Sequence, residues 1–209
     1  PYTVYCQPVD VIVNGEYKGC YQLCDQISVD KNRVPVTEMT PEDITEPNLT
    51  GGYLVEVDAY AGSEKSMFTS SKGIPVTIKS PGEDEIVKQQ SAYIKGAFNL
   101  MESALWSSNF KDETKGYRHY LNLESFLKHF LVGEFAGNID TYWSVYMYKN
   151  RNEDAFTIGP SWDFDLAFNN DNRVYPVCGK SDWLYRSGAS MANGMRNFVD
   201  RIIMSDPQA

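Results

Sequence analysis

The spacing of apolar residues changes near Ser80-Pro81-Gly82, and this change limits the folds that the chain can adopt. Upstream, apolar residues tend to alternate with polar ones, which is typical of strands with one buried face. Downstream, they recur every three or four residues, which is typical of amphipathic helices. Strands therefore precede helices, and the sequence predicts an α+β fold.

The strand-rich part begins with a predicted hairpin over residues 9–27. Asn14-Gly15 separates its two apolar runs, and this dipeptide is a strong signal for a two-residue hairpin turn. Polar residues and prolines then indicate an irregular surface connection over residues 28–52. Further strands are predicted at residues 52–58 and 75–79, and alternation in the first of them places Leu54, Glu56 and Asp58 on one face.

The second part contains two long helical patterns. The first covers about 20 residues to Leu105, with Glu83, Asp84 and Glu85 in its first turn. The second begins after Asn122, a good N-cap residue, and ends near Gly137. Two short strands are predicted at 143–149 and 155–158, followed by a third helical pattern from Met191 to Ile202. We therefore divide the chain into a strand-rich N-lobe-like part, residues 1–82, and a helical C-lobe-like part, residues 83–209.

Composition excludes some classes of partner. The chain has 209 residues and a formal net charge of -9, so it lacks the basic surface that binds a phosphate backbone, and we expect no nucleic-acid partner. No apolar run approaches the roughly 18 residues of a membrane span, and no signal-peptide pattern is found. Because the sequence starts at Pro1, we expect a processed or trimmed piece, and these observations leave its compartment open.

The cysteines form no recognisable framework. Cys6, Cys20, Cys24 and Cys178 match neither a zinc-site spacing nor a disulfide scaffold. On one strand Cys20 and Cys24 would be about 13 Å apart, too far to bridge. We expect buried thiols, and a disulfide between Cys6 and one of the pair stays an open alternative.

An acid pair, Asp163-Phe164-Asp165, lies within an aromatic and apolar run. In an extended strand both carboxylates would project from one face, while Trp162 and Phe164 would project from the other. Such oxygen ligands suit Mg2+, and carboxylates in apolar surroundings are costly without a cation. Asp163 and Asp165 are therefore candidate metal ligands, although a capped turn or a structural ion pair is the alternative.

Other residues complete a candidate phosphoryl-transfer site. Such a site needs a group that orients or deprotonates the attacking hydroxyl, acids that hold Mg2+, and a cation for the phosphates. Asp140 is the candidate base, Asn138 a candidate to position it or to bind a second metal, and Lys79 the candidate phosphate ligand. The alternatives are a helix-terminal turn for Asp140 and Asn138, and a solvated strand end for Lys79.

Several further residues have competing interpretations. Lys31 and Arg33 compete with Lys79 as nucleotide ligands, because the polar connection could fold over a nucleotide. Trp162 and Tyr142 are candidates to stack on adenine, although buried aromatic core is the more common role. The remaining candidates are interpreted as structural: Glu134 as part of an ion pair, and His119 and His129 as surface or satisfied core residues.

The order of short motifs resembles that of the CotH kinase family, which is named for spore coat protein H. The matching segments are Val11-Ile12-Val13-Asn14-Gly15-Glu16-Tyr17-Lys18-Gly19, Asp30-Lys31-Asn32-Arg33-Val34, Gly52-Tyr53-Leu54-Val55-Glu56-Val57-Asp58, Gly73-Ile74-Pro75 with Ile78-Lys79, Asn138-Ile139-Asp140 and Gly159-Pro160-Ser161-Trp162-Asp163-Phe164-Asp165. The standard kinase signatures, a glycine-rich loop, His-Arg-Asp and Asp-Phe-Gly, are not found in the sequence.

The resemblance implies a two-lobed, atypical protein-kinase-like fold that uses ATP and Mg2+, or Mn2+, to phosphorylate Ser or Thr of a protein. It also implies an extracytoplasmic place, in a spore coat or at a cell surface. Where the family is expected to have Glu after the hairpin, this chain has Asp25, whose shorter side chain would weaken an ion pair to the phosphate-binding lysine. Family members are longer at both ends, so we expect a fragment.

Two other functions fit the same sequence. One is a non-catalytic coat or cell-surface module in which a kinase-like scaffold recruits a partner protein. The other is a metal-dependent phosphoesterase that uses the same acids, which would release free phosphate without labelling an acceptor.

Overall fold

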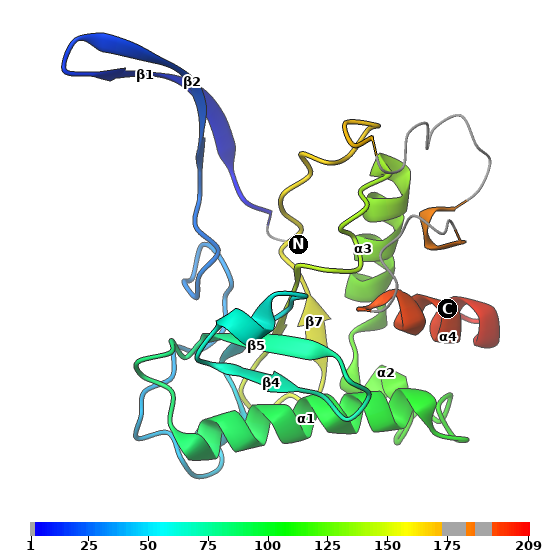
Figure 1. Cartoon of the computed structure of the whole chain (residues 1–209). Helices are drawn as coiled ribbons and strands as arrows, with labels where there is room; N and C mark the ends of the chain where they lie inside the picture. The colour runs from blue at the N-terminus through cyan, green and yellow to red at the C-terminus, as the bar shows by residue number, and fades with distance from the viewer. Residues whose placement is uncertain (1–2, 173–182, 187–193) are drawn as a thin grey trace.

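The structure, a computed structural model, describes residues 3–172, 183–186 and 194–209 (Figure 1). Its strands are β1 (Cys6–Val13), β2 (Glu16–Cys24), β3 (Tyr53–Val57), β4 (Met67–Thr69), β5 (Pro75–Ser80), β6 (Val145–Lys149) and β7 (Phe156–Ile158). Its helices are α1 (Lys88–Trp106), α2 (Tyr117–Tyr120), α3 (Leu123–Ala136) and α4 (Arg196–Ser205). The α+β class is therefore confirmed.

The predicted N-terminal hairpin is confirmed. β1 and β2 pair antiparallel and form a separate two-stranded sheet that extends away from the rest of the chain (Figure 1). Asn14 and Gly15 have φ angles of 53° and 83°, which match the left-handed conformations required by a two-residue turn. Cys20 and Cys24 are exposed and Cys6 is partly exposed, so the expectation of buried thiols is wrong for the two β2 residues. Cys178 lies outside the described residues.

The main sheet has the strand order β4-β5-β3-β6-β7, and every neighbouring pair is antiparallel. β3, β4 and β5 precede Gly82, whereas β6 and β7 follow α3. The two parts of the chain therefore share one sheet, and the fold alone does not establish a two-lobed arrangement. The division at residues 82–83 stays a prediction.

Helix α1 packs on one face of this sheet. Its apolar residues at spacings of three and four, Ile94, Phe98, Met101 and Leu105, are all fully buried. They contact the sheet residues that alternation places on the same side, including Tyr53, Val55, Val57, Val76 and Met147. Burying each large apolar side chain contributes about 1.5–3 kcal/mol, so this layer supplies the main stabilisation of the fold.

The opposite face of the sheet carries Leu54, Glu56, Tyr146 and Tyr148, and it is covered only in part. Val34 and Val36 pack there with Leu54 and Tyr146 in a smaller cluster. Of this face, Tyr146 also lines a large cavity, described below. One face of the sheet therefore forms the core, and the other presents side chains to a candidate site.

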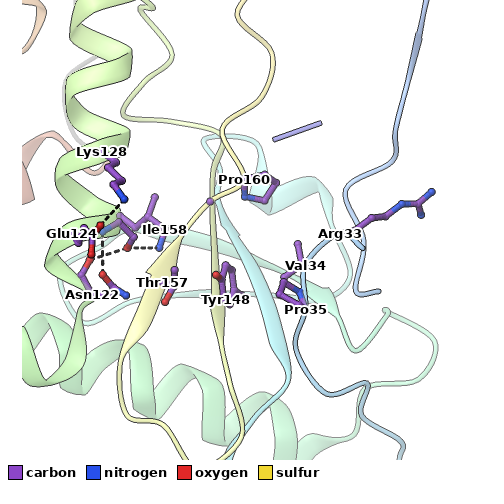
Figure 2. Close-up of a pocket in the computed structure, with 12 residues that line it drawn as sticks. Arg33, Val34, Pro35, Asn122, Glu124, Lys128, Tyr148, Thr157, Ile158 and Pro160 are labelled. Carbon is purple, nitrogen blue, oxygen red and sulfur yellow. Dashed lines mark hydrogen bonds and ion pairs between the residues drawn. The ribbon is translucent and has the colours of Figure 1, made fainter. Parts of the chain in front are cut away.

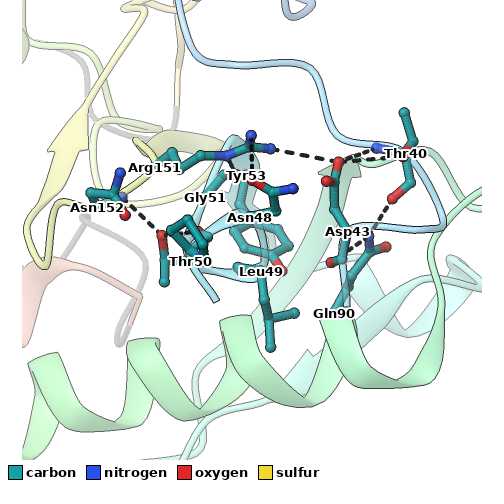
Figure 3. A network of polar contacts seen from close by, with 11 residues as sticks. Thr40, Asp43, Asn48, Leu49, Thr50, Gly51, Tyr53, Gln90, Arg151 and Asn152 are labelled. Atoms are coloured by element: carbon teal, nitrogen blue, oxygen red, sulfur yellow. Dashed lines mark hydrogen bonds and ion pairs between the residues drawn. The ribbon is translucent and has the colours of Figure 1, made fainter. Parts of the chain in front are cut away.

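A polar network fixes the irregular connection before β3 (Figure 3). The Asp43 carboxylate accepts a hydrogen bond from the Thr40 backbone N–H at 2.9 Å and lies 3.5 Å from the Arg151 guanidinium. Gln90 donates from its side-chain amide to the Thr40 carbonyl at 2.7 Å. The connection is thus held against α1 and against the turn after β6.

Three other sequence-based expectations need correction. Glu83, Asp84 and Glu85 precede α1, which begins at Lys88, and the short strand β4 was not predicted. The last described helix runs from Arg196 to Ser205, while Met191 lies outside the described residues.

Among the helices that the structure describes, none combines the length and apolar character needed to cross a bilayer.

Candidate functional site

A cavity of about 1000 Å³, here called the main cavity, lies beside the sheet face that carries Glu56 and Tyr146. Residues from several parts of the chain line it. They are Thr3, Val4 and Cys6 near the N-terminus, Gln22, Cys24, Asp25, Gln26 and Ile27 at the end of the hairpin, Lys79 of β5, Val132 of α3, Tyr146 of β6, and the continuous segment Ser161, Trp162, Asp163, Phe164 and Asp165. The cavity therefore brings Lys79 together with Trp162, Asp163 and Asp165.

Lys79 reaches the cavity from an irregular position in β5. Leu54 pairs with Ser80 and Val55 with Ile78, so Lys79 is the extra residue of a β-bulge. Bulges commonly redirect a side chain next to a functional site. Lys79 Nζ lies 3.1 Å from a carboxylate oxygen of Glu56 and 3.7 Å from one of Glu64.

The ion pair with Glu56 is partly shielded from solvent. Burial raises the pKa of Glu56, and this effect outweighs the opposing influence of Lys79 and of a hydrogen bond with Tyr146. Burial by itself would lower the pKa of Lys79, but Glu56, Glu64 and Asp58 raise it. Lys79 is thus held as a cation by surrounding carboxylates.

This geometry corrects one sequence-based expectation. Asp25 was expected to replace the acid that pairs with the phosphate-binding lysine, but it lies 3.4 Å from the guanidinium of Arg33. The carboxylate nearest to Lys79 belongs to Glu56 on β3. The ion pair is therefore made by Glu56, and the shorter side chain of Asp25 does not weaken it.

The acid segment is not a strand, contrary to the prediction. Among residues 162–165 none belongs to a strand, and Asp163 has a φ of 54°, in the left-handed region that Asp and Asn tolerate better than most residues. Trp162 anchors the segment, since its indole N–H donates to the Ser144 carbonyl at 2.9 Å. Its ring also contacts Tyr146 edge-on, with 5.6 Å between centroids.

The two acids nevertheless lie together, as predicted. Burial raises the pKa of Asp163, and the charge of Asp165, a hydrogen bond with Asp165 and the charge of Asp140 raise it further. Negative charge from three acids is therefore concentrated here. A cation bound at this point would relieve that repulsion.

Asp140 and Asn138 follow α3 in a tight turn. Gly137 ends the helix with a left-handed φ of 63°, and the buried side chain of Asn138 accepts a hydrogen bond from the Asp140 backbone N–H at 3.2 Å. Both residues line a small pocket of about 30 Å³ together with Asp163 and Trp162. The turn thus places Asp140 next to the acid segment.

Two residues of α3, His129 and Gly133, contact this turn and hold it in place. His129 Nε2 lies 2.8 Å from the Thr141 carbonyl, and burial lowers the pKa of His129, so the neutral ring donates this hydrogen bond. Thr141 packs directly on Gly133, where an added Cβ would lie 2.1 Å from Thr141 Oγ1. The interpretation of His129 as a satisfied core residue agrees with these contacts.

The donor set is compatible with a magnesium ion shared with phosphates. Among the described residues, no three His, Cys, Asp or Glu side chains are grouped closely enough to enclose an ion by themselves. Mg2+ is usually held by one or two carboxylates together with substrate phosphates and water, rather than by an all-protein cage. Asp163 and Asp165 provide two such carboxylates, and Asn138 lines the small pocket together with Asp163.

Neither Lys31 nor Arg33 lines the main cavity, although Arg33 contacts Asp25, which does. Arg33 lines a second pocket of about 340 Å³ with Val34, Tyr148 and Lys128 (Figure 2). Its guanidinium donates to Ser28 Oγ at 2.9 Å. Lys31 is an exposed turn residue that does not line the main cavity. Their role as nucleotide ligands stays a prediction without support from the cavity lining.

Glu134 and Tyr142 have structural partners. The Glu134 carboxylate accepts hydrogen bonds from the Tyr142 hydroxyl and from the backbone N–H groups of Leu184 and Tyr185, the last at 2.9 Å. A structural role was predicted for Glu134, but these partners are neutral groups and not the cation that was expected. Tyr142 is 2% exposed, so the structure favours core packing over stacking on adenine.

Two residues of the site were not predicted. Glu56 was assigned to a strand face without a role, and Tyr146 was not considered. The available signal was Glu56 itself, a carboxylate in the otherwise apolar strand β3, where it is 5% exposed. Buried carboxylates require a partner, so Glu56 could have been matched with Lys79 on a neighbouring strand.

Comparisons with known proteins identify the chain by family. Residues 2–208 match the protein family described as CotH kinase protein, which covers nearly the whole chain. No curated protein and no solved structure matches the chain.

Proposed function

The chain belongs to the CotH kinase protein family, and on this premise we propose that it transfers the γ-phosphate of ATP to Ser or Thr of a protein in a Mg2+-dependent reaction. A kinase-like protein is what the family membership itself indicates. One observation supports the proposal: Lys79, Asp163 and Asp165 all line the main cavity, and Asp163 also lines the small pocket that contains Asp140.

Each charged residue has a role in this proposal. Lys79, oriented by Glu56 at 3.1 Å, binds the phosphates of ATP as a point charge. Asp140 accepts the proton of the acceptor hydroxyl, whose oxygen then bonds to the γ-phosphorus while the bond to the bridging oxygen of ADP breaks. Asn138 positions Asp140 by accepting a hydrogen bond from its backbone N–H.

Asp163 and Asp165 would hold the metal ion. When bound, Mg2+ would supply the positive charge that offsets the negative charge of the phosphates. Mn2+, which also prefers oxygen ligands, is expected to substitute. Trp162 borders the main cavity with its ring fixed by Ser144 and Tyr146, and we assign it to the adenine side of the site.

The proposed acceptor and compartment rest on the resemblance to the family and not on the cavity. We propose a coat or cell-surface protein rich in Ser and Thr as the acceptor, and an extracytoplasmic location in a spore coat or at the cell surface. The second pocket beside Arg33 has no assigned role in this reaction.

A non-catalytic interaction module is the second candidate function. It is favoured by one observation, the exposed apolar side chains on the extended hairpin, which include Ile12, Tyr17, Tyr21 and Leu23. Exposed apolar groups of this kind often mark binding surfaces. In this case a partner protein would bind equally well to the wild type and to Asp140→Asn.

The proposal is tested by thermal unfolding of the protein with ATP and Mg2+. We expect ATP and Mg2+ together to raise the melting temperature, because a ligand that binds the native state stabilises it. Asp163→Asn should abolish this shift and the labelling of a serine-rich acceptor protein by γ-labelled ATP. Asn tolerates the left-handed backbone at residue 163, so this substitution removes charge without adding strain.

Asp84→Asn is the matched control, because Asp84 is exposed and does not line the main cavity. This variant should keep both the shift and the labelling. Absence of any metal-dependent shift in the wild-type protein would overturn the proposal. Release of free phosphate without a labelled acceptor would identify a phosphoesterase.

A further inference from the structure

Cys6 and Cys24 lie directly opposite each other at the open end of the β1–β2 hairpin. Cys6 of β1 pairs with Cys24 of β2, and the one irregularity in the ladder is farther along, between Val11 and Ile12. Side chains directly opposite on antiparallel strands project from the same face. The two thiols therefore point to the same side of the hairpin, and both line the main cavity.

The hydrogen-bond pattern places the two cysteines in the closer kind of cross-strand pair. The Asp25 backbone N–H donates to the Tyr5 carbonyl at 2.8 Å, so Tyr5 and Asp25 form a hydrogen-bonded pair. Bonded and non-bonded pairs alternate along an antiparallel ladder, so Cys6 and Cys24 form a non-hydrogen-bonded pair. Cα atoms in such pairs are about 4.5 Å apart, within the range that a disulfide spans.

The Cys6 thiol also affects the pKa of Cys24. A hydrogen bond with the Cys6 thiol is the first cause that raises the pKa of Cys24, followed by burial and by the charges of Cys6 and Asp163. Both cysteines are free thiols in the structure, and both are at least partly exposed to solvent. An oxidant in solution can therefore reach the pair.

Cys20 cannot replace Cys24 in this pair. It lies opposite Asp10, four residues before Cys24 in β2, and is therefore about 13 Å from Cys24. Cys6 is accordingly too far from Cys20 for a disulfide without a shift of strand register.

We propose that Cys6 and Cys24 form a disulfide that closes the hairpin beside the main cavity. The oxidant is a small-molecule disulfide such as oxidised glutathione. One protein thiolate attacks a sulfur atom of the oxidant and releases one thiol, and the second protein thiolate then displaces the other. Two protein thiols lose their protons and two electrons, and one disulfide is reduced to two thiols.

The disulfide has a clear structural consequence. Isolated two-stranded sheets are marginally stable, and the β1–β2 sheet has no third strand among the described residues. A covalent bond at its open end would hold Thr3 and Val4 near Gln26 and Ile27, all of which border the main cavity. This inference does not depend on the proposed kinase activity.

The test uses the complete chain and a glutathione redox buffer. After incubation and acid quenching, free thiols are alkylated and the protein is cleaved with trypsin. Cleavage after Lys18 separates the two cysteines, so the disulfide would join peptide 1–18 to peptide 19–31. We expect mass spectrometry to find this linked pair in oxidising buffer and to lose it after reduction with dithiothreitol.

Variants assign the bond to one cysteine, because Cys20 and Cys24 lie in the same peptide. The linked pair should persist in Cys20→Ser, the matched control, and disappear in Cys24→Ser. Three results would overturn the inference: complete alkylation of Cys6 in oxidising buffer, persistence of the linked pair in Cys24→Ser, or linkage of Cys6 only between two copies of the chain.

Discussion

Lys79 Nζ lies 3.1 Å from a carboxylate oxygen of Glu56, and this ion pair connects the bulge of β5 to the neighbouring strand β3. Glu56 is 5% exposed, and the ordinary side-chain alternation of β3 places it on the cavity side of the sheet. The same pair therefore serves stability, by neutralising a buried carboxylate, and the proposed function, by aiming a lysine into the main cavity.

Replacement of Lys79 by methionine should affect both properties. Lys79→Met leaves Glu56 buried without its cation, which costs about 2–3 kcal/mol of the free energy of unfolding. Chemical denaturation measures this loss. The same variant should also lose the stabilisation by ATP and Mg2+, measured as the shift of melting temperature.

The matched control is Lys65→Met. Lys65 pairs with Glu83 at 2.8 Å, but its side chain is 75% exposed. Exposed ion pairs contribute little, so this variant should unfold at the wild-type denaturant concentration. Equal destabilisation by the two variants would contradict the special role of the buried pair.

Trp162 should report nucleotide binding by its fluorescence. Its ring borders the main cavity, and the hydrogen bond to Ser144 fixes its orientation. We expect ATP with Mg2+ to change the intrinsic tryptophan emission of the wild type, and Trp162→Phe to remove most of that change. Trp106→Phe is the control, because Trp106 contacts Arg201 near the end of α1 and does not line the cavity. A response that survives in Trp162→Phe would place the nucleotide elsewhere.

Local sequence patterns predicted most secondary-structure elements. The Asn14-Gly15 turn, the α3 N-cap at Asn122 and the helix end at Gly137 were all located from short-range chemistry. Asn122 accepts a hydrogen bond from the Ser125 backbone N–H, which satisfies one of the free N–H groups at the start of the helix. Such signals are local, so they do not depend on the rest of the fold.

The acid segment was mispredicted because its conformation depends on distant contacts. Alternation of acids and aromatic residues over 162–165 suggested a strand, but no neighbouring strand pairs with them in the structure. The Ser144 carbonyl holds Trp162, and Asp163 takes a left-handed backbone conformation. The grouping of Asp163 with Asp165 was nevertheless predicted, because two residues so close in sequence stay near each other in either conformation.

The partner of Lys79 could not be found from sequence spacing alone. Glu56 and Lys79 are neighbours only because β3 and β5 pair and because a bulge shifts the register between Leu54 and Val55. A bulge has no reliable signature in this sequence. The resemblance to the family pointed to Asp25 instead, and Asp25 lies beside Arg33.

Asp206 should make stability depend on pH in the acid range. Its buried carboxylate accepts hydrogen bonds from the Tyr117 hydroxyl at 2.8 Å and from Arg118 at 2.7 Å. Burial by itself would raise the pKa of Asp206, but these bonds and one from the Gln208 backbone N–H lower it below the ordinary value of 3.8. The stabilisation is therefore complete above pH 3.8 and is lost as the pH falls through the lower, folded-state pKa.

Asp206→Asn tests this dependence. We expect a loss of about 2 kcal/mol in the free energy of unfolding at pH 7, since hydrogen bonds to a charged group are replaced by weaker ones. The difference from the wild type should shrink as the pH falls below 3.8. Urea denaturation at several pH values measures it, with Asp84→Asn as the exposed control. A difference that stays constant down to the acid limit would contradict the assignment.

Two glycines in helices should respond in opposite ways to replacement by alanine. Gly96 lies in α1, where an added Cβ meets no atom within 4 Å, so Gly96→Ala should stabilise the protein by about 0.5–1 kcal/mol through helix propensity. Gly133 lies in α3, where the added Cβ would be 2.1 Å from Thr141 Oγ1 and 2.7 Å from Thr141 Cβ.

Gly133→Ala should therefore destabilise the protein by about 2 kcal/mol, because the clash outweighs the gain in helix propensity. Thr141 is buried and follows Asp140 directly, so the turn that carries the proposed base must also move. We expect lower acceptor labelling by this variant even at a temperature where it is fully folded. Denaturation curves and labelling rates for the two alanine variants measure both effects. Wild-type labelling by folded Gly133→Ala would show that the position of Asp140 is not set by its contact with α3.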